Sequence, residues 1–114
     1  MSYSKSHHFK LDPLLTSQFC RTLMHPARLQ ILFFLFKNGQ SNYDLIYRNI
    51  PLSRPSVSRH IRQLLDAHCV ILQDLGNKTF YEINPERLEL YAIVFRDLAL
   101  EINKGLLELP DGSV

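Results

Sequence analysis

Residues 52–65 read Leu-Ser-Arg-Pro-Ser-Val-Ser-Arg-His-Ile-Arg-Gln-Leu-Leu, and this stretch decides the fold. Ser53 is a favourable helix cap, and Pro55 fits the first turn, where its missing N–H would have had no partner. The residues that share one narrow stripe lie at i, i+4, i+7, i+8 and i+11: Val57, Ile61, Leu64, Leu65 and His68. The pattern predicts a helix from Ser53 to His68 that buries this stripe and keeps the rest of its circumference polar.

Three shorter helices are predicted before this one. Amphipathic spacing favours helices over residues 12–23 and 26–37 and a short one over 43–48, in which Leu45 and Ile46 face inward. The helix over 26–37 is apolar around most of its circumference, so we expect it to be buried centrally. Pro26 is compatible with its first turn, and Asn38-Gly39 is a typical stop signal.

The period of the pattern changes after the long helix. β-branched and aromatic residues flank a turn at Gly76-Asn77, which predicts a β-hairpin over residues 70–83. Asn84-Pro85 then opens a last helix that runs to about Leu107. The predicted fold class is therefore mostly α with a small β-hairpin, a winged helix-turn-helix in the order α-α-α-α-β-β-α.

Length and composition are those of a single globular domain. The chain has 114 residues, of which 46% are apolar and 21% charged. We expect a flexible polar tail over residues 1–10 and one domain over residues 11–109. The first residues lack the apolar segment of a secretory signal, and the longest apolar run, 31–36, is too short to span a bilayer. These features predict a cytoplasmic protein.

Positive charge is concentrated in the middle of the chain. Between Leu45 and Leu65 there are four arginines and no acidic residue, namely Arg48, Arg54, Arg59 and Arg62. Between Glu82 and Asp111 there are seven acidic residues and three basic ones. Because cations that meet phosphates supply most of the affinity of a protein for DNA, the middle segment is the one expected to approach a duplex.

Three segments carry a resemblance to a known family. They are His-Pro-Ala-Arg-Leu-Gln-Ile-Leu at 25–32, the stretch from Leu52 to Ile61, and Gly-Asn-Lys-Thr-Phe-Tyr at 76–81. In this order and spacing, from about Phe19 to Leu88, the chain resembles the ArsR/SmtB family of bacterial winged-helix repressors. The resemblance implies a homodimer, built largely from the first and last helices, that represses a nearby promoter and often releases it when a metal binds.

The residues that match the family motif are the candidate DNA contacts. Arg54, Ser56, Ser58 and Arg59 are assigned to the bases or the groove, since arginine can bind guanine O6 and N7 bidentately. Weaker candidates are His60, Arg62, Arg48, Asn77 and Lys78. For His60 the alternative is a partly buried structural histidine. For the two weaker arginines it is solubility, and for Asn77 and Lys78 it is a plain polar turn.

The last helix predicts the mode of assembly. It is apolar almost all round, and one small domain offers too few surfaces to cover it. We therefore expect a homodimer, with a fully intramolecular core as the alternative. The expected interface residues are Leu14, Leu15, Phe19, Tyr91, Val94, Phe95, Leu98 and Ile102.

The chain departs from the metal-sensing members of the family. These typically carry Cys-x-Cys in the third helix, where the aligned positions here are Ser41 and Tyr43, and others use histidines on the last helix, which has none. We therefore expect no bound metal and no cofactor, and the effector is unknown. Cys20 and Cys69 form either a redox pair or, as free cysteines usually do, two small buried hydrophobes.

The predicted function is that of a sequence-specific regulator of transcription, with the role of a repressor. It would bind double-stranded DNA as a homodimer, with the 53–68 helix in the major groove and the 70–83 hairpin as the wing. An enzyme is not expected, because no Gly-rich phosphate loop and no nucleophile-base signature is found. The alternative is a winged-helix module for protein contact alone, against which the four arginines argue.

Overall fold

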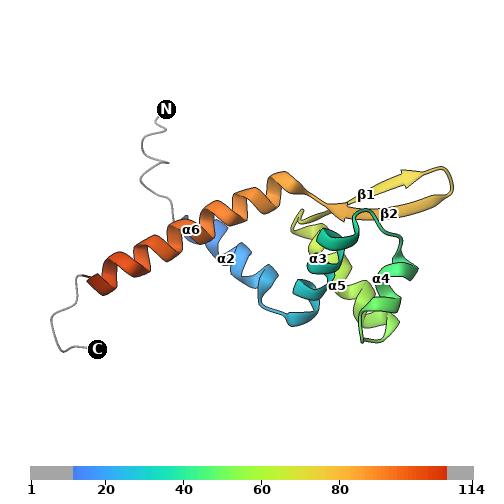
Figure 1. Cartoon of the computed structure of the whole chain (residues 1–114), viewed down its shortest axis with the longest axis horizontal. Coiled ribbons are helices and arrows are strands. Elements are labelled where there is room, and N and C mark those ends of the chain that lie inside the picture. Colours follow the sequence, from blue (N-terminus) through green and yellow to red (C-terminus); the bar gives the residue numbers. More distant parts are fainter. Residues whose placement is uncertain (1–11, 108–114) are drawn as a thin grey trace.

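The computed structural model describes residues 12–107 and contains the predicted order of elements (Figure 1). The elements are α2 (Pro13–Leu23), α3 (Pro26–Asn38), α4 (Tyr43–Asn49), α5 (Arg54–Asp66), β1 (Val70–Leu75), β2 (Lys78–Ile83) and α6 (Pro85–Leu107). The predicted winged helix-turn-helix fold is confirmed. The tail expected over residues 1–10 and the ends of the domain expected over 11–109 lie outside the described residues.

Side-chain caps begin the four helices before the hairpin. The side chains of Asp12, His25, Asn42 and Ser53 each accept a hydrogen bond from a backbone N–H in the first turn of α2, α3, α4 and α5. Gly39 ends α3 with φ of 76°, a left-handed conformation that glycine adopts without steric cost. Local sequence signals therefore set these helix boundaries.

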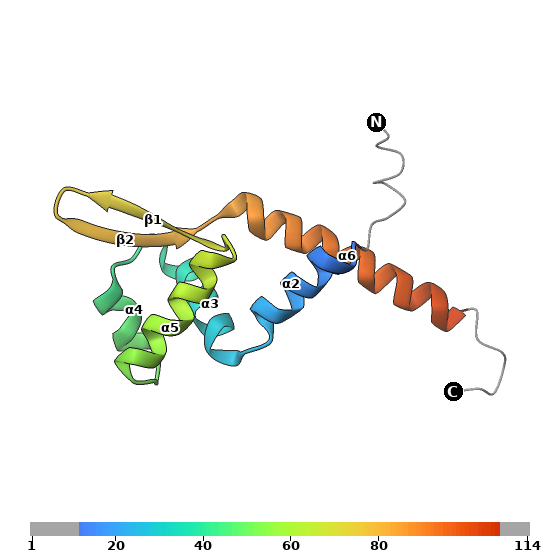
Figure 2. The same cartoon turned by 180° about the vertical axis from the view of Figure 1, so that it is seen from behind.

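The core lies where α3 and α5 cross beneath the hairpin. Ile31 on α3, Ile46 on α4, and Val57 and Leu64 on α5 are all completely buried. On the other side of the molecule α2 packs along α6, and the Phe19 ring meets the Tyr91 ring edge-on at 5.1 Å between centroids. Figure 2 shows α6 continuing past α2, away from the helix-turn-helix.

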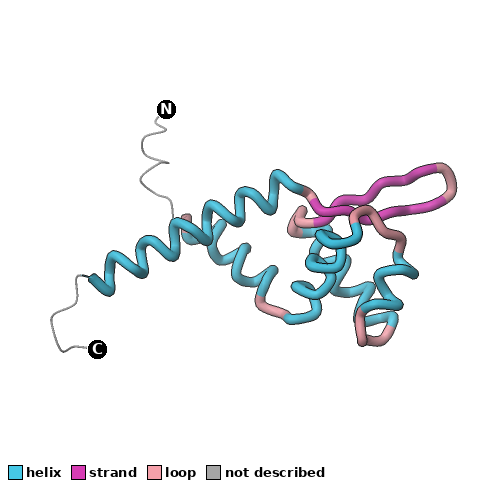
Figure 3. Tube along the Cα trace, viewed as in Figure 1, coloured by secondary structure: helices cyan, strands magenta, loops and turns pink. Residues whose placement is uncertain are grey.

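The hairpin projects from the body beside α4 (Figure 3). β1 and β2 pair antiparallel, from Val70 opposite Ile83 to Leu75 opposite Lys78. At the base, Ser41 and Tyr81 exchange backbone hydrogen bonds of 3.0 and 2.8 Å, which tie the loop before α4 to β2. The hairpin is thus anchored to the helix-turn-helix at one end and free at its tip.

Two details of the predicted α5 are wrong. The helix ends at Asp66, so His68 lies beyond it, exposed and with φ of 62°. The chain must reverse there to start β1, and the backbone N–H groups of His68 and Cys69 cap the last carbonyls of α5. His60, which lies beside the stripe, is buried on the inner face of α5.

Some apolar residues that were expected inside lie at the surface. Phe33 and Phe36 on α3 are 62% and 59% exposed, and Leu45 on α4 is exposed as well. The physical reason is that the elements packed against α3, namely α2, α4, α5 and β2, cover only part of its circumference and leave these side chains largely open to solvent. No helix in this range is long and apolar enough to cross a membrane.

Candidate nucleic-acid interface

The outer face of α5 carries most of the predicted contact residues. Ser58, Arg59 and Arg62 are exposed, and Ser56 is half-buried near the start of the helix. The opposite face, with Val57 and Ile61 among others, is buried against α3. Burial of one stripe therefore turns the hydroxyls and guanidinium groups of the other side toward solvent.

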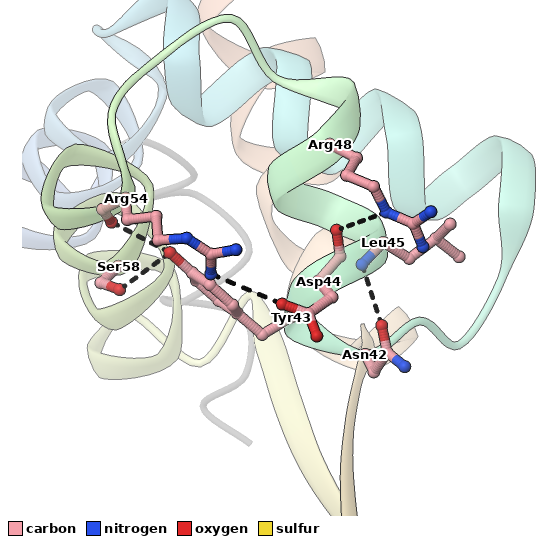
Figure 4. A network of polar contacts seen from close by, with 7 residues as sticks. All are labelled: Asn42, Tyr43, Asp44, Leu45, Arg48, Arg54 and Ser58. Carbon is pink, nitrogen blue, oxygen red and sulfur yellow. Dashed lines mark hydrogen bonds and ion pairs between the residues drawn. The ribbon is translucent and has the colours of Figure 1, made fainter.

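Tyr43 joins the two helices of the helix-turn-helix (Figure 4). Its hydroxyl donates to the backbone carbonyl of Arg54 at 3.0 Å and accepts from Ser58 Oγ at 3.3 Å. This residue was not predicted as part of the site. The available signal was the pair of tyrosines Tyr43 and Tyr47, one turn apart on α4, whose rings are stacked.

Arg54 lies along α4 instead of extending outward from α5. Its guanidinium carbon is 4.2 Å from the centre of the Tyr47 ring, and its Nη1 is 3.5 Å from Asp44 Oδ1. The ion pair is weak, because the side chains of Arg54 and Asp44 are 58% and 68% exposed. The guanidinium therefore lies over the Tyr47 ring and stays largely open to solvent.

The remaining cations differ in their surroundings. Arg62 lines a small cleft of about 130 Å³ between α5 and the hairpin, together with Tyr43, Ser58 and Tyr81. Arg48 is exposed on the last turn of α4, and its Nε donates to the carbonyl of Asp44 at 3.4 Å.

The tip of the hairpin is the part of the predicted site that lies farthest from α5. Asn77 and Lys78 are exposed there, next to Gly76, whose φ of 72° makes the turn. The turn between the two strands projects from the body of the molecule (Figure 3).

His60 is removed from the candidate contacts. It is only 5% exposed, its ring centroid is 4.3 Å from that of His25, and its Nδ1 has no hydrogen-bond partner among the described residues. The reason is its place on the inner face of α5, one residue from Ile61. Burial lowers the pKa of His60, and the adjacent His25, Arg28 and Arg59 lower it further. His60 is thus held neutral beneath the outer face.

Acidification is therefore expected to destabilise the fold. In the unfolded chain His60 binds a proton near pH 6.5, but in the folded chain it does so only at lower pH. The free energy of unfolding is therefore full above about pH 6.5 and falls as the pH drops below that value. Urea unfolding between about pH 7.5 and 5 measures this effect. His60→Phe should lose less stability over that range than the wild type, whereas the exposed-site control His68→Asn should follow the wild type. Identical pH dependence for His60→Phe and the wild type would contradict the assignment.

The two cysteines have different environments. Cys69 is completely buried, and burial raises the pKa of its thiol to about 11, which leaves it protonated and unreactive. Cys20 is exposed on α2, so the alternative of two buried hydrophobes holds for Cys69 and is wrong for Cys20. Both thiols are free in this structure.

The residues expected at a dimer interface fall into two groups. Phe19, Tyr91 and Val94 are buried within the single chain, where they belong to its hydrophobic core. The others are exposed or half-buried: Leu14, Leu15, Phe95, Leu98 and Ile102. The face that is free to meet another molecule therefore lies toward the C-terminal half of α6.

The positions aligned with metal ligands of the family have structural roles. Ser41 is buried beside β2, and its hydroxyl donates to the carbonyl of Gly39 at 2.9 Å. The Tyr43 hydroxyl is bonded to α5, as described above. Within residues 12–107 no group of three or more histidine, cysteine or acidic side chains is placed to hold a metal ion.

A helix-turn-helix made of α4 and α5, followed by an anchored hairpin, defines a winged helix-turn-helix protein, and the class binds DNA through the second helix. Residues 25–71 match the family described as "Bacterial regulatory protein, arsR family". An uncharacterized HTH-type transcriptional regulator of Mycobacterium tuberculosis, Rv0081, is 31% identical over 103 residues, which cover 88% of this chain and 90% of the relative. The chain belongs to the arsR family of bacterial transcriptional regulators.

Further comparisons agree with this membership. The arsenical resistance operon repressor of Staphylococcus xylosus is 33% identical over 73 residues, which cover 64% of this chain and 69% of the relative. The crystal structure of Rv0081 superposes with a TM-score of 0.59 at 28% identity, over 81% of this chain and 93% of that one. A homodimeric winged helix-turn-helix domain from Mycobacterium bovis, solved by NMR, has the same fold, with a TM-score of 0.59 at 23% identity, over 76% and 80% of the two chains.

Proposed function

We propose that this protein is a homodimeric repressor that binds double-stranded DNA with α5 in the major groove and the β1–β2 hairpin against the flanking backbone. The observation that carries the proposal is the outer face of α5, where Ser58, Arg59 and Arg62 are exposed and no acidic residue occurs before Asp66. A polar, cationic helix face mounted on a buried stripe meets the two needs of recognition, contact with phosphates and contact with base edges.

The arginines have different proposed roles. Arg59 points from the middle of α5 and is assigned to base edges, while Ser56 and Ser58 permit close approach near the helix N-terminus. Arg54 is assigned to a phosphate, because Tyr47 holds its guanidinium along the surface of α4. Arg48 and Arg62 are assigned to phosphates on either side, and Asn77 and Lys78 to the backbone or minor groove beyond the wing.

These roles predict different outcomes for two substitutions. Arg59→Ala is expected to lose about 1–3 kcal/mol of binding free energy on the specific sequence and to relax sequence preference, whereas Lys78→Ala should weaken all sequences alike. Titrations of specific and random duplexes at one fixed salt concentration measure both effects. Lys37→Ala, at the end of α3 and away from the proposed face, is the control for loss of one positive charge. Equal losses on both duplexes for both variants would refute the assignment.

The dimer is proposed to form through the apolar residues that one chain leaves uncovered. Leu14 on α2 and Phe95 and Ile102 on α6 are 68%, 58% and 56% exposed. An apolar groove of about 410 Å³ between α2, α3 and α6 adjoins them and is lined by Phe19, Leu23, Phe36, Leu88, Tyr91, Ala92 and Phe95. A large exposed apolar area on a small protein marks an interface, and a second copy of the same face would cover it.

The effector of this repressor is proposed to act without a thiolate metal site on α4. The relative from Staphylococcus xylosus is named for arsenical resistance, but Ser41 and Tyr43 here have hydroxyls that already serve the fold. A serine hydroxyl is also a poor ligand for thiophilic metals.

Binding to the DNA upstream of the protein's own gene tests the proposed function. We expect a complex at low ionic strength whose affinity falls steeply as salt is added, because each phosphate contact releases counterions. The absence of a salt-sensitive complex would refute DNA binding and leave a winged-helix module for protein contact.

A further inference from the structure

Arg28 is a buried cation at the junction of α2, α3 and α5. It is only 9% exposed. Its Nε donates to the carbonyl of Thr22 at 2.8 Å and its Nη2 to the carbonyl of Arg21 at 3.0 Å, both at the C-terminal end of α2. Its Nη1 donates to Oε1 of Gln63 on α5. One side chain thus connects the α2–α3 turn to the helix proposed to read DNA.

The charge of Arg28 is not balanced by a carboxylate. Within residues 12–107, the ion pairs closer than 4.0 Å are Arg54–Asp44 and Arg96–Asp97, and neither involves Arg28. The carbonyl end of α2 offers the guanidinium only about half an elementary negative charge. A guanidinium has five N–H donors, and the three hydrogen bonds of Arg28 leave two of them, one on each terminal nitrogen. Burial makes an unbalanced charge costly, so a nearby anion would be stabilised.

A pocket of about 340 Å³ opens beside this guanidinium. It is lined by Gln18, Arg21, Thr22, Arg28, Gln63, Asp66 and Ala67. Two cations and one acid leave a net positive charge, and the amides of Gln18 and Gln63 add neutral hydrogen-bond donors. The volume is that of a small-molecule site rather than a macromolecular one.

We propose that this pocket binds a small oxyanion, a carboxylate or a phosphate, through the free N–H donors of Arg28 and the side chain of Arg21. The planar guanidinium fork matches the two oxygens of such a group. An anion on the two free donors shares the guanidinium with Gln63 and so changes the strength of the hydrogen bond that joins α5 to the α2–α3 turn. This regulatory consequence rests on the proposed function, whereas the binding site itself does not.

Calorimetric titration of the free protein, without DNA, tests the site. Inorganic phosphate and succinate are the two probes, and succinamide is the neutral control. We expect saturable binding of at least one anion and none of succinamide. If only phosphate binds, the ligand of the pocket is a phosphate group. If only succinate binds, the ligand is a carboxylate group. Binding of neither anion would overturn the proposal, as would binding of succinamide with equal affinity.

Charge variants at the rim locate the site without disturbing Arg28, whose three hydrogen bonds make its replacement a risk to folding. Arg21→Gln should weaken anion binding and Asp66→Asn should strengthen it, each by about three- to tenfold. Arg59→Gln makes the same charge change as Arg21→Gln, but on the outer face of α5, and should leave anion binding unchanged. Loss of binding in Arg59→Gln, or no change in the two rim variants, would place the anion elsewhere and overturn the proposal.

A DNA titration in the presence of the anion that binds then tests the regulatory consequence. The affinity of the wild type for its DNA should change at constant ionic strength, and the change should be smaller in Arg21→Gln at the same anion concentration. An identical change in both proteins would show competition at the DNA surface and refute the coupling. Failure of DNA binding itself would be seen before any anion is added, so the two outcomes are distinguishable.

Discussion

Replacing Ile102 by aspartate is expected to yield a folded monomer that binds DNA at least about 100-fold more weakly than the wild type. Ile102 is 56% exposed near the C-terminal end of α6, so the variant keeps the core of the single chain intact. In the proposed dimer, however, the aspartate would be buried against apolar residues, which opposes its ionisation and the association itself. A monomer contacts only one half-site of the DNA. It therefore loses the affinity that is gained when two linked subunits bind two half-sites together.

Sedimentation of the variant and DNA titration at one salt concentration measure the two effects. Asn103→Asp adds the same charge one residue further, on a side of α6 turned by about 100°, and should remain dimeric. If Ile102→Asp still sediments as a dimer, the proposed face is not the interface. A monomer with undiminished DNA affinity would show that DNA binding does not require the dimer.

Leu64→Ala is expected to lower the free energy of unfolding by about 3 kcal/mol, near the middle of the range for buried leucines. Leu64 is completely buried on α5, where it packs in the core formed with α3. Truncation removes buried apolar surface and leaves a cavity that two packed helices cannot close by small shifts. The change also weakens the packing of α5 against α3, so the affinity for DNA should fall as well.

Urea unfolding at one fixed protein concentration measures this loss, since the stability of a dimer depends on concentration. Leu65→Ala is the matched control, because Leu65 is the same residue type on the same helix but only half-buried. It should lose clearly less. A loss in Leu64→Ala no larger than in Leu65→Ala would contradict the orientation of α5 described here.

The elements of the fold were predictable because their signals are local. Ser53 and Pro55 set the start of α5, Gly76 and Asn77 set the hairpin turn, and Asn84-Pro85 set the start of α6. Each signal acts within one turn of the chain. The end of α5 was predicted two residues too late because the stop depends on His68, which adopts a left-handed conformation. Glycine or asparagine at that position would have been a clearer stop signal.

The candidate site was predictable in part. The exposed positions of Arg59 and Arg62 follow from the stripe on the opposite side of α5. The position of Arg54 does not, because it depends on Tyr47 and Asp44 of the preceding helix. The burial of His60 agrees with the alternative of a structural histidine, but its contact with the His25 ring depends on how α3 and α5 pack.

By itself, the sequence determined the order of the helices and the hairpin, the inner and outer faces of α5, and the uneven distribution of charge. Helix caps, prolines and the spacing of apolar residues act between residues a few positions apart, so these elements can be predicted from the sequence alone. Only the tertiary structure decided which apolar residues of α3 and α6 remain exposed and which polar groups become buried. Arg28 and Gln63 are 35 residues apart, and Tyr43 and Ser58 are 15 apart. Such contacts form only when helices pack, because burial and charge balance depend on neighbours in space.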